Sequence, residues 1–291
     1  MALKNLLGKL MKMQFRKDLE HFFEEDDLFR NHFYFNSLPT DVVECQLHIK
    51  SPMVLAGLPY FFSVFEFLGA KNLGEEFMQN FEGKKVDETF GPLKFSLPFN
   101  IALTGERLAL NLLTHASGIA TRTFEYTKKA SEFAISVLDT RKTTPGLKSL
   151  EKYAVLVGGG SNHRFAQTDV WMVKDNHKNF FGGVKAALDF FNNQRGFYKP
   201  LVLEVHNLEE LKEAIELKVV HIMLDNFSPE MIKLAVDIKP GHMTYEVSGG
   251  ITQDNLEEFL INGIDAISTS ALTRNPARVD LSLKMRRINE L

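Results

Sequence analysis

The sequence has a single cysteine, Cys45, among its 291 residues. One thiol can form neither an intrachain disulfide nor a thiolate metal cluster, so neither device can stabilise the fold. Cys45 lies in a run that alternates between apolar and polar residues, which is typical of a strand with one solvated face. We therefore expect a protein of a reducing compartment and assign it to the cytoplasm.

Two further absences exclude whole classes of protein. No uninterrupted apolar run approaches the roughly 20 residues that a transmembrane helix needs, so we expect no membrane association. The formal net charge of -3 lacks the basic excess of a general nucleic-acid-binding protein, so we expect no nucleic-acid partner. The basic beginning, 1–17, has neither the arginine and serine bias of a transit peptide nor the long apolar core of a signal peptide. It predicts an ordinary amphipathic helix.

The sequence also lacks the motifs of several well-known chemistries. It has no Walker motif, no zinc-ligand cluster and no serine-nucleophile elbow. The glycine triplet Gly158-Gly159-Gly160 neither follows a clear strand nor opens a helix, so we interpret it as a turn. We therefore expect catalysis without a covalent nucleophile.

Residues 1–130 predict a small α+β domain. Apolar and polar residues alternate over 43–49, which predicts a strand. A helix is expected over 58–68, because Pro59 suits a first turn and Gly69 ends the apolar run. Two extended pieces are expected near 80–86 and 93–97, and a long helix from Gly105. A small sheet packed against helices follows from this order.

Beyond residue 130 the pattern changes to strand, turn and helix, repeated through 131–274. Strands are predicted at 135–138, 170–173, 201–205, 220–224, 244–247 and 265–268. Helices are predicted between them at 177–191, 208–217, 229–236 and 254–261. Alternating units of this kind predict an α/β domain with a parallel sheet covered by helices.

Polar side chains follow nearly every predicted strand of this second domain. The strand ends read Asp139-Thr140-Arg141-Lys142, Lys174-Asp175-Asn176, Glu204, Asp225-Asn226, Ser248-Gly249-Gly250 and Ser268-Thr269-Ser270. If the strands close toward a barrel, all of these groups meet at one rim. Cations would then face carboxylates there, beside two loops whose backbone N–H groups suit a phosphate.

In this order, these residues resemble the quinolinate phosphoribosyltransferase family, the carboxylating nicotinate-nucleotide pyrophosphorylases of NAD synthesis. The similarity extends from about residue 56 to the carboxyl end. It rests on Glu106-Arg107, Asn111, Ser117-Gly118-Ile119-Ala120-Thr121, Asp139-Thr140-Arg141-Lys142-Thr143, Asn162-His163-Arg164, Val173-Lys174-Asp175-Asn176-His177, Leu224-Asp225-Asn226-Phe227 and Ser248-Gly249-Gly250-Ile251.

The resemblance implies an N-terminal α+β sandwich domain at 1–130, rejoined by 275–291, followed by an open TIM-like α/β barrel at 131–274. It also implies a homodimer in which one subunit's sandwich domain covers the neighbour's barrel mouth, and it leaves larger assemblies open. The implied reaction converts quinolinate and phosphoribosyl pyrophosphate to nicotinate mononucleotide, diphosphate and carbon dioxide, with Mg2+ as cofactor.

The resemblance also implies a role for each site residue. Quinolinate's two carboxylates would be held by Arg107 of the neighbouring subunit together with Arg141, His163, Arg164 and Lys174. The catalytic residues would be Lys142, between the two substrates, and Glu204 and Asp225, which face the ribose hydroxyls and the magnesium ion directly or through water. Thr140 would contact substrate, and the 5-phosphate would be bound by Ser248, Gly249, Gly250 and Ser270.

The sequence departs from the family pattern without losing these charges. Ser270 stands where the family often has glycine, Arg274 where it often has histidine, and Val202 where it usually has an acid. A second hypothesis keeps the phosphoribosyl donor and takes another acid or pyridine as acceptor, as in paralogues. Against it, His163, Arg164, Arg107 and Arg141 favour a dicarboxylate. A third hypothesis is a non-catalytic binding protein, which predicts the loss of catalytic charges that this chain retains.

Overall fold

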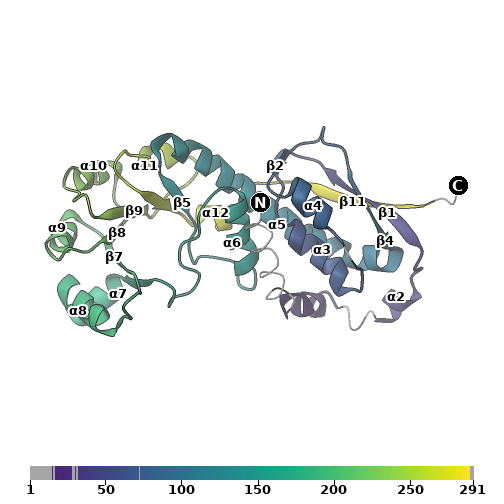
Figure 1. Cartoon of the computed structure of the whole chain (residues 1–291), viewed down its shortest axis with the longest axis horizontal. Helices are drawn as coiled ribbons and strands as arrows, with labels where there is room; N and C mark the ends of the chain where they lie inside the picture. The colour runs from purple at the N-terminus through teal and green to yellow at the C-terminus, as the bar shows by residue number, and fades with distance from the viewer. Residues whose placement is uncertain (1–14, 16, 28–29, 31, 72, 289–291) are drawn as a thin grey trace. The chain divides into compact units, whose positions relative to one another are not determined.

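The computed structural model describes residues 15, 17–27, 30, 32–71 and 73–288. The helix expected at 1–17 lies almost wholly outside them. The described residues form two compact units (Figure 1). Unit 1 takes its described residues from Met1–Arg122, Thr144–Gly159 and Asn275–Leu291, and unit 2 from Thr123–Thr143 and Gly160–Arg274. The sequence analysis had expected 144–159 within the barrel.

Unit 1 is built on an antiparallel sheet whose strand order is β11-β1-β4. β1 (Val42–Ile49) is central, between β4 (Leu93–Pro98) and β11 (Leu281–Arg287). A second, two-stranded sheet pairs β2 (Met53–Val54) with β3 (Lys85–Val86). The helices of unit 1 include α2 (His32–Ser37), α3 (Leu58–Phe67), α4 (Glu75–Phe81) and α6 (Lys148–Val157). The long helix α5 (Phe99–Ala130) begins in unit 1 and belongs to unit 2 from Thr123 on. The predicted strands at 43–49 and 93–97 and the helix at 58–68 are thus confirmed.

Two predicted boundaries in unit 1 are wrong. The segment expected to be extended near residue 80 forms helix α4 through Phe81, and β3 begins only at Lys85. Two phenylalanines explain why this segment is helical. Phe77 and Phe81 lie four residues apart on one helical face, and their ring centroids are 6.0 Å apart. Phe77 also packs on Phe62 and Phe95.

Helix α5 begins at Phe99, six residues before the predicted Gly105. Its first N–H groups find backbone partners without a side-chain cap, since Phe99 donates to the carbonyl of Asp41 and Asn100 to that of Pro39. Gly105 serves close packing inside the helix, because a Cβ there would lie 2.8 Å from the Phe65 ring. Gly105 is therefore an interior residue of α5 and does not mark where the helix begins.

Unit 2 is a parallel sheet of six strands in the order β5-β10-β9-β8-β7-β6. The strands are β5 (Ser136–Leu138), β6 (Trp171–Val173), β7 (Leu201–Val205), β8 (His221–Asp225), β9 (Thr244–Ser248) and β10 (Ala266–Ser268). All six predicted strands are confirmed to within one residue at each end. β5 and β6 are the two edges, so the sheet is open, and Ser161 adds a single bridge beside β5. The α/β fold class with an open TIM-like barrel is confirmed.

The helices of unit 2 follow the strands. They are α7 (Asp175–Phe181), α8 (Val184–Gln194), α9 (Leu208–Glu216), α10 (Pro229–Asp237), α11 (Leu256–Phe259) and α12 (Ala271–Arg274). The single helix predicted at 177–191 is two helices, because Gly182 and Gly183 adopt φ angles of 85° and 135° that a helix cannot continue. The helix predicted at 254–261 is shorter than expected. Ser228 caps α10, its side chain accepting from the N–H of Met231.

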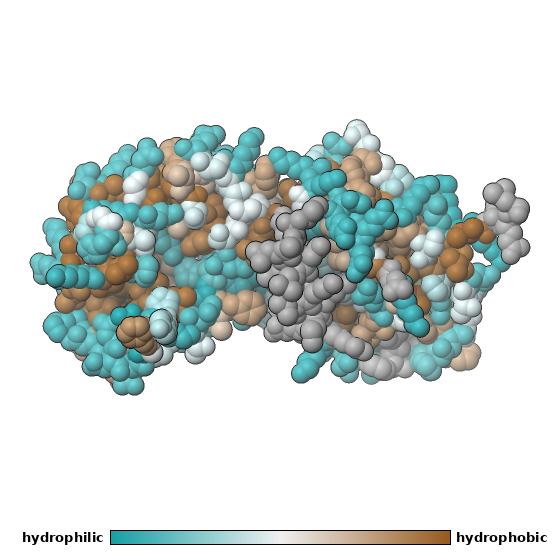
Figure 2. Space-filling view, viewed as in Figure 1, coloured by the Kyte–Doolittle hydropathy of each residue, from teal (hydrophilic) through white to brown (hydrophobic). Residues whose placement is uncertain are grey.

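The inner positions of these helices are apolar, whereas their outer surfaces are mixed, since Phe180 of α7 and Phe190 of α8 are exposed. In Figure 2 mainly hydrophilic residues cover the end of unit 2 that carries α7 and α8, at the lower left of the view. Leu211 and Ala214 of α9 are buried, as a one-sided apolar stripe requires. No helix among the described residues is both long and apolar enough to cross a membrane.

Cys45 is buried in β1 of unit 1. Burial, together with the negative charges of Glu106 and Glu44, raises the pKa of its thiol to about 12. The thiolate is the reactive form of cysteine, so this side chain is chemically inert at neutral pH.

Candidate active site

Strand register gathers the polar side chains of unit 2 on one face of the sheet. One row of paired residues across the sheet runs Glu204, Met223, Glu246 and Ala266, and the next row toward the carboxyl ends runs Asp225, Ser248, Ser268 and Leu138. Residues two apart on a strand share a face, so both rows point the same way. Lys174 and His206 follow β6 and β7 directly.

Carboxylates and cations meet at this end of the sheet. The Lys174 ammonium forms a very short contact with Glu204, which is nearly buried. Burial and the negative charge of Glu204 raise the pKa of Asp225, and the charges of Lys174 and Lys142 act in the opposite sense. The structure thus brings together Lys142, Lys174, Glu204 and Asp225, which come from four separate strand ends.

The same cluster has the donors of a cation site. Single ligand atoms of Glu204, His206 and Asp225 lie within 4.8 Å of one another. Mg2+ prefers oxygen ligands and commonly uses one or two carboxylates with substrate oxygens. Because Glu204 raises the pKa of Asp225, the two carboxylates repel, and a divalent cation between them would relieve that repulsion. The residues therefore fit Mg2+.

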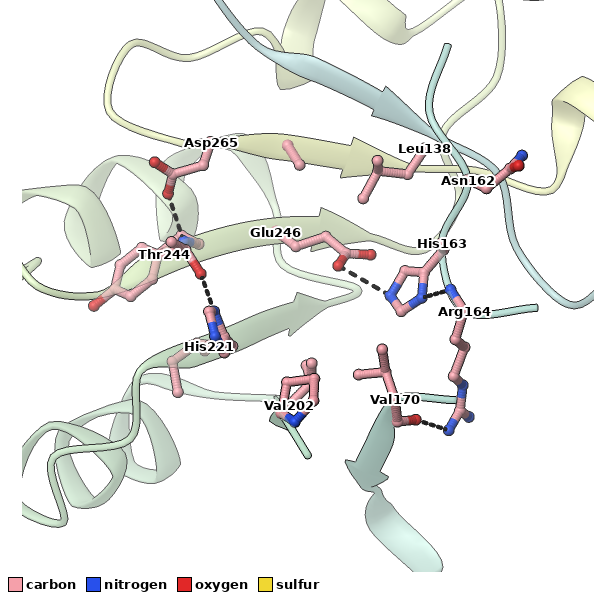
Figure 3. A pocket seen from close by; sticks show the side chains of 14 residues that line it. Leu138, Asn162, His163, Arg164, Val170, Val202, His221, Thr244, Glu246 and Asp265 are labelled. Atoms are coloured by element: carbon pink, nitrogen blue, oxygen red, sulfur yellow. Dashed lines mark hydrogen bonds and ion pairs between the residues drawn. The ribbon is translucent and has the colours of Figure 1, made fainter. Parts of the chain in front are cut away.

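A pair of arginines lies beside the cluster. Burial lowers the pKa of Arg164, and so does the positive charge of Arg141. The Arg164 guanidinium donates from Nη1 to the carbonyl of Val170 at 2.9 Å (Figure 3). Two guanidinium groups that repel each other in this way would be stabilised by a bound anion, and arginine pairs bidentately with carboxylates.

His163 is held by protein partners at both ring nitrogens. Its Nδ1 accepts from the N–H of Arg164 at 2.6 Å, and its Nε2 lies 3.2 Å from Oε2 of Glu246. Figure 3 shows the His163 ring and the Glu246 carboxylate pointing toward each other above the sheet. Neither nitrogen is therefore turned toward the cations, and the predicted contact of His163 with a substrate carboxylate stays a prediction.

The inner face of the sheet encloses a cavity of about 310 Å3. Its wall combines aliphatic side chains, among them Val170 and Val202, with polar and charged ones such as Glu246. Val202, which replaces the acid usual in the family, packs with Met172 and Met223. Figure 3 shows Arg164 and His163 at the end of the cavity where the strands finish. Asp265 and His221 line the opposite end, so the cavity has polar groups at both ends of the strands.

Two loops of glycine, serine and threonine complete the rim. Gly249 and Gly250 have φ angles of 99° and 67°, and a Cβ on Gly249 would lie 2.3 Å from Oδ1 of Asn226. In the second loop, Thr269 donates to the carbonyl of Ile251 at 2.7 Å, and Thr273 donates to the carbonyl of Lys142 at 2.8 Å. The loop containing Ser270 is therefore tied both to the glycine loop and to the backbone of Lys142.

The scan against family models matches residues 119–284 to the description "Quinolinate phosphoribosyl transferase, C-terminal domain". The chain belongs to the quinolinate phosphoribosyltransferase family. Residues 119–284 contain both the sheet of unit 2 and the polar strand ends, and the recognised region is therefore the one that carries the candidate site.

Similar family members cover most of this chain. It is 40% identical over 251 residues to a probable nicotinate-nucleotide pyrophosphorylase [carboxylating] of Methanocaldococcus jannaschii, covering 80% of this chain and 83% of that one. It is 36% identical to the human nicotinate-nucleotide pyrophosphorylase [carboxylating], covering 83% and 82%. The crystal structure of NadC from Streptococcus pyogenes matches with a TM-score of 0.84 and 34% identity, covering 95% of this chain and 98% of that chain.

Two residues that the family resemblance assigns to substrate lie differently from the rest. Arg107 is exposed on α5 in unit 1, whereas the cluster belongs to unit 2. Thr140 shapes the turn after β5, because its Oγ1 accepts from the N–H of Lys142 at 3.0 Å. Its hydroxyl therefore positions the backbone of a predicted catalytic residue.

Asp139 is a member of the family motif to which sequence analysis gave no role. Its carboxylate is fully buried and accepts from Nδ2 of Asn162 at 2.6 Å and from the N–H of His163 at 2.9 Å. It thereby fixes the segment that carries Arg164 against the end of β5.

We expect Asp139→Asn to lower the free energy of unfolding by about 1–3 kcal/mol. The NH2 group of asparagine would face one of the two N–H groups, of Asn162 and His163, that donate to the carboxylate. Urea denaturation followed by circular dichroism measures this loss. The matched control is Asp254→Asn at an exposed position, which should change stability by no more than about 0.5 kcal/mol. Equal stability of both variants would contradict the role given to Asp139.

Proposed function

We propose that this chain transfers the phosphoribosyl group of phosphoribosyl pyrophosphate to the ring nitrogen of quinolinate, releasing diphosphate and carbon dioxide and forming nicotinate mononucleotide. The observation that carries the proposal is the meeting of Lys142, Lys174, Glu204 and Asp225, with Arg164 alongside, at the carboxyl ends of one parallel sheet. Both substrates are polyanions, which such a set of cations neutralises. Ligands of open α/β sheets bind at this end.

The dicarboxylate acceptor suits the arginine pair. Arg141 and Arg164 repel each other, and a planar carboxylate can accept two parallel hydrogen bonds from each guanidinium. Lys174 pairs with Glu204 at the same end of the sheet, so it can contact the second carboxylate of quinolinate while remaining balanced by Glu204.

The phosphoribosyl donor suits the other half of the rim. The Gly249-Gly250 loop and the Ser270 loop offer backbone N–H and hydroxyl groups to the 5-phosphate. Glu204 and Asp225 would face the ribose hydroxyls and would hold Mg2+. When bound, Mg2+ offsets the negative charge that builds up on the departing diphosphate.

The residues act on charge that develops during the reaction. The bond from the anomeric carbon to diphosphate breaks with its electron pair on diphosphate, and Lys142 stabilises that negative charge. The carboxylates of Glu204 and Asp225 stabilise the positive ribose, and the ring nitrogen of quinolinate supplies the electron pair of the new bond. The adjacent carboxylate then leaves as carbon dioxide, its electron pair stays on the ring carbon, and solvent protonates that carbon. The quaternary nitrogen drives this last step, and the protein contributes position and exclusion of water.

The proposal includes a cytoplasmic homodimer in which Arg107 of one subunit completes the site of the other. Two observations support sharing of the site. Arg107 is exposed on the surface of α5, and it belongs to unit 1, whereas the cations of the cluster belong to unit 2. A symmetric dimer can supply such a residue reciprocally to both sites.

We expect the glycine loop to tolerate substitution unequally. Gly249→Ala combines an unfavourable φ angle with a Cβ 2.3 Å from Oδ1 of Asn226, so the loop must shift, at a cost of about 1–3 kcal/mol. The KM for phosphoribosyl pyrophosphate should rise about tenfold or more. Gly250→Ala is the matched control, because no atom lies within 4 Å of its Cβ position. Steady-state kinetics on both variants makes the test, and a similar KM for the two would contradict this loop assignment.

The choice of acceptor tests the function itself. The purified protein is incubated with phosphoribosyl pyrophosphate, Mg2+ and either quinolinate or nicotinate, and nicotinate mononucleotide is measured by chromatography. We expect product from quinolinate alone. Product from nicotinate would contradict the proposal. The absence of product with both acids from a folded protein would also contradict it, and would favour a paralogue with another acceptor.

A further inference from the structure

We propose that His206 is a positioning residue that holds the carboxylates of Glu204 and Asp225 through its Nε2–H group, and that the ion pair of Lys178 and Glu210 fixes this tautomer. None of His206, Lys178 and Glu210 was singled out by the sequence patterns. The inference deepens the proposed function, because Glu204 and Asp225 are the carboxylates assigned there to ribose and Mg2+.

Lys178 projects from α7 into a nearly closed site, with only 4% of its side chain exposed. Its ammonium lies 2.7 Å from Oε2 of Glu210 and 3.1 Å from Nδ1 of His206. Glu210 balances the buried charge, and its own place is fixed, because the same Oε2 accepts from the N–H of His206 at 2.9 Å. The N–H of Glu210 in turn donates to Oδ1 of Asn207, the N-cap of α9, at 2.8 Å.

This arrangement decides which ring nitrogen of His206 carries the proton. An ammonium group has three donors and no acceptor, so Nδ1 must be the acceptor of the contact with Lys178. A neutral imidazole whose Nδ1 accepts has its hydrogen on Nε2.

The Nε2–H group faces the two predicted catalytic carboxylates. Nε2 lies 3.4 Å from Oδ2 of Asp225 and 3.8 Å from Oε1 of Glu204. These carboxylates repel each other, as the raised pKa of Asp225 shows. A hydrogen-bond donor between the two carboxylates offsets part of their repulsion. It also fixes how each carboxylate is oriented, and therefore where the remaining oxygen atoms point.

A consequence concerns the metal. Nε2 is the ring nitrogen of His206 that faces the two carboxylates, yet its lone pair is not available when it carries a hydrogen. The site therefore offers a cation only carboxylate oxygens. Such a donor set suits Mg2+, whereas an available imidazole nitrogen would favour Zn2+ and other transition metals.

The tautomer can be observed directly in the wild-type enzyme. The protein is labelled with 15N-histidine and long-range 1H–15N correlation spectra are recorded at neutral pH without substrate, with His206→Asn identifying the resonances of His206 among the nine histidines. We expect the neutral Nε2–H form. An Nδ1–H form, or a doubly protonated ring, would overturn the proposal. This measurement needs no catalysis, so its failure and that of the proposed function are distinguishable.

Kinetics separates positioning from a merely structural role. Gln at position 206 can present an N–H near the place of Nε2, whereas Asn cannot reach it. We expect His206→Asn to raise the KM for phosphoribosyl pyrophosphate by about 10–100-fold and His206→Gln to recover most of that loss. The control is His242→Gln, at an exposed position in unit 2. Equal losses in the Asn and Gln variants, or no loss in either, would overturn the proposal, and circular dichroism of each variant verifies that it is folded.

Discussion

Replacing Lys142 with alanine is expected to lower kcat/KM by about a thousandfold, because the diphosphate leaving group loses a cation that stabilises its developing charge. Lys142 is exposed in the structure, and its charge acts on Asp225. Its side chain therefore contributes little to the core, and the loss should appear without a change in melting temperature. Steady-state assays with quinolinate, together with a thermal melt, measure both quantities.

A surface lysine provides the matched control. Lys185→Ala removes an equally charged side chain from α8, where the ammonium contacts only Asp189 at 2.5 Å in an exposed pair. Exposed pairs of this kind contribute about 0–1 kcal/mol to stability, so activity should stay within about twofold. A Lys142→Ala enzyme that retains wild-type kcat/KM would contradict the catalytic role given to the cluster.

Replacing Arg107 with alanine is expected to abolish nearly all activity, although Arg107 lies on α5 in unit 1 and outside the cluster of unit 2. In the proposed dimer this arginine binds a carboxylate of quinolinate in the partner's site. Mixing the separately inactive Arg107→Ala and Lys142→Ala chains under exchange conditions should restore activity. A mixed dimer has one site with both residues intact, so random exchange of equal amounts should recover about a quarter of wild-type activity.

A second mixture supplies the control for this complementation. Lys142→Ala and Asp225→Asn both change the same cluster in unit 2, so every site in their mixed dimer lacks one of the two groups. No recovery is expected from that pair. Recovery in both mixtures, or in neither under conditions where native mass spectrometry shows exchange, would contradict a site shared through Arg107.

The architecture of unit 2 was accessible from sequence because its strands and its charges obey local rules. Each buried run is short and ends at polar residues, and the ends of parallel strands must lie at one edge. The meeting of Lys142, Lys174, Glu204 and Asp225 follows from that rule alone. That the sheet stays open does not follow from this rule. Whether the edge strands β5 and β6 pair with each other depends on what surrounds them.

The residues that sequence analysis missed act through contacts between distant segments. His206 follows Val202 and Glu204 at intervals of two, so strand alternation could have placed it on the same face. Its partner Lys178 is 28 residues away in sequence, and no pattern links the two. Glu246 could likewise have been found two residues before Ser248, but its contact with His163 depends on the path of the segment between α6 and β6.

The segment 144–159 shows the same limit. It lies between two barrel strands in sequence, yet its described residues belong to unit 1. There Tyr153 of α6 donates to Oε1 of Glu82 at 2.8 Å and packs against Tyr60. Such a crossing between units is decided by side-chain partners, and local periodicity contains no information about them.

The central claim is that one site couples phosphoribosyl transfer to decarboxylation of quinolinate. The most direct test uses quinolinate labelled with 13C in the carboxylate adjacent to the ring nitrogen, with phosphoribosyl pyrophosphate and Mg2+, followed by 13C NMR. The account predicts that one labelled carbon dioxide or bicarbonate appears for each nicotinate mononucleotide formed, and that no label is released without the phosphoribosyl donor. Label retained in the nucleotide product, or label released when the donor is left out, would contradict it.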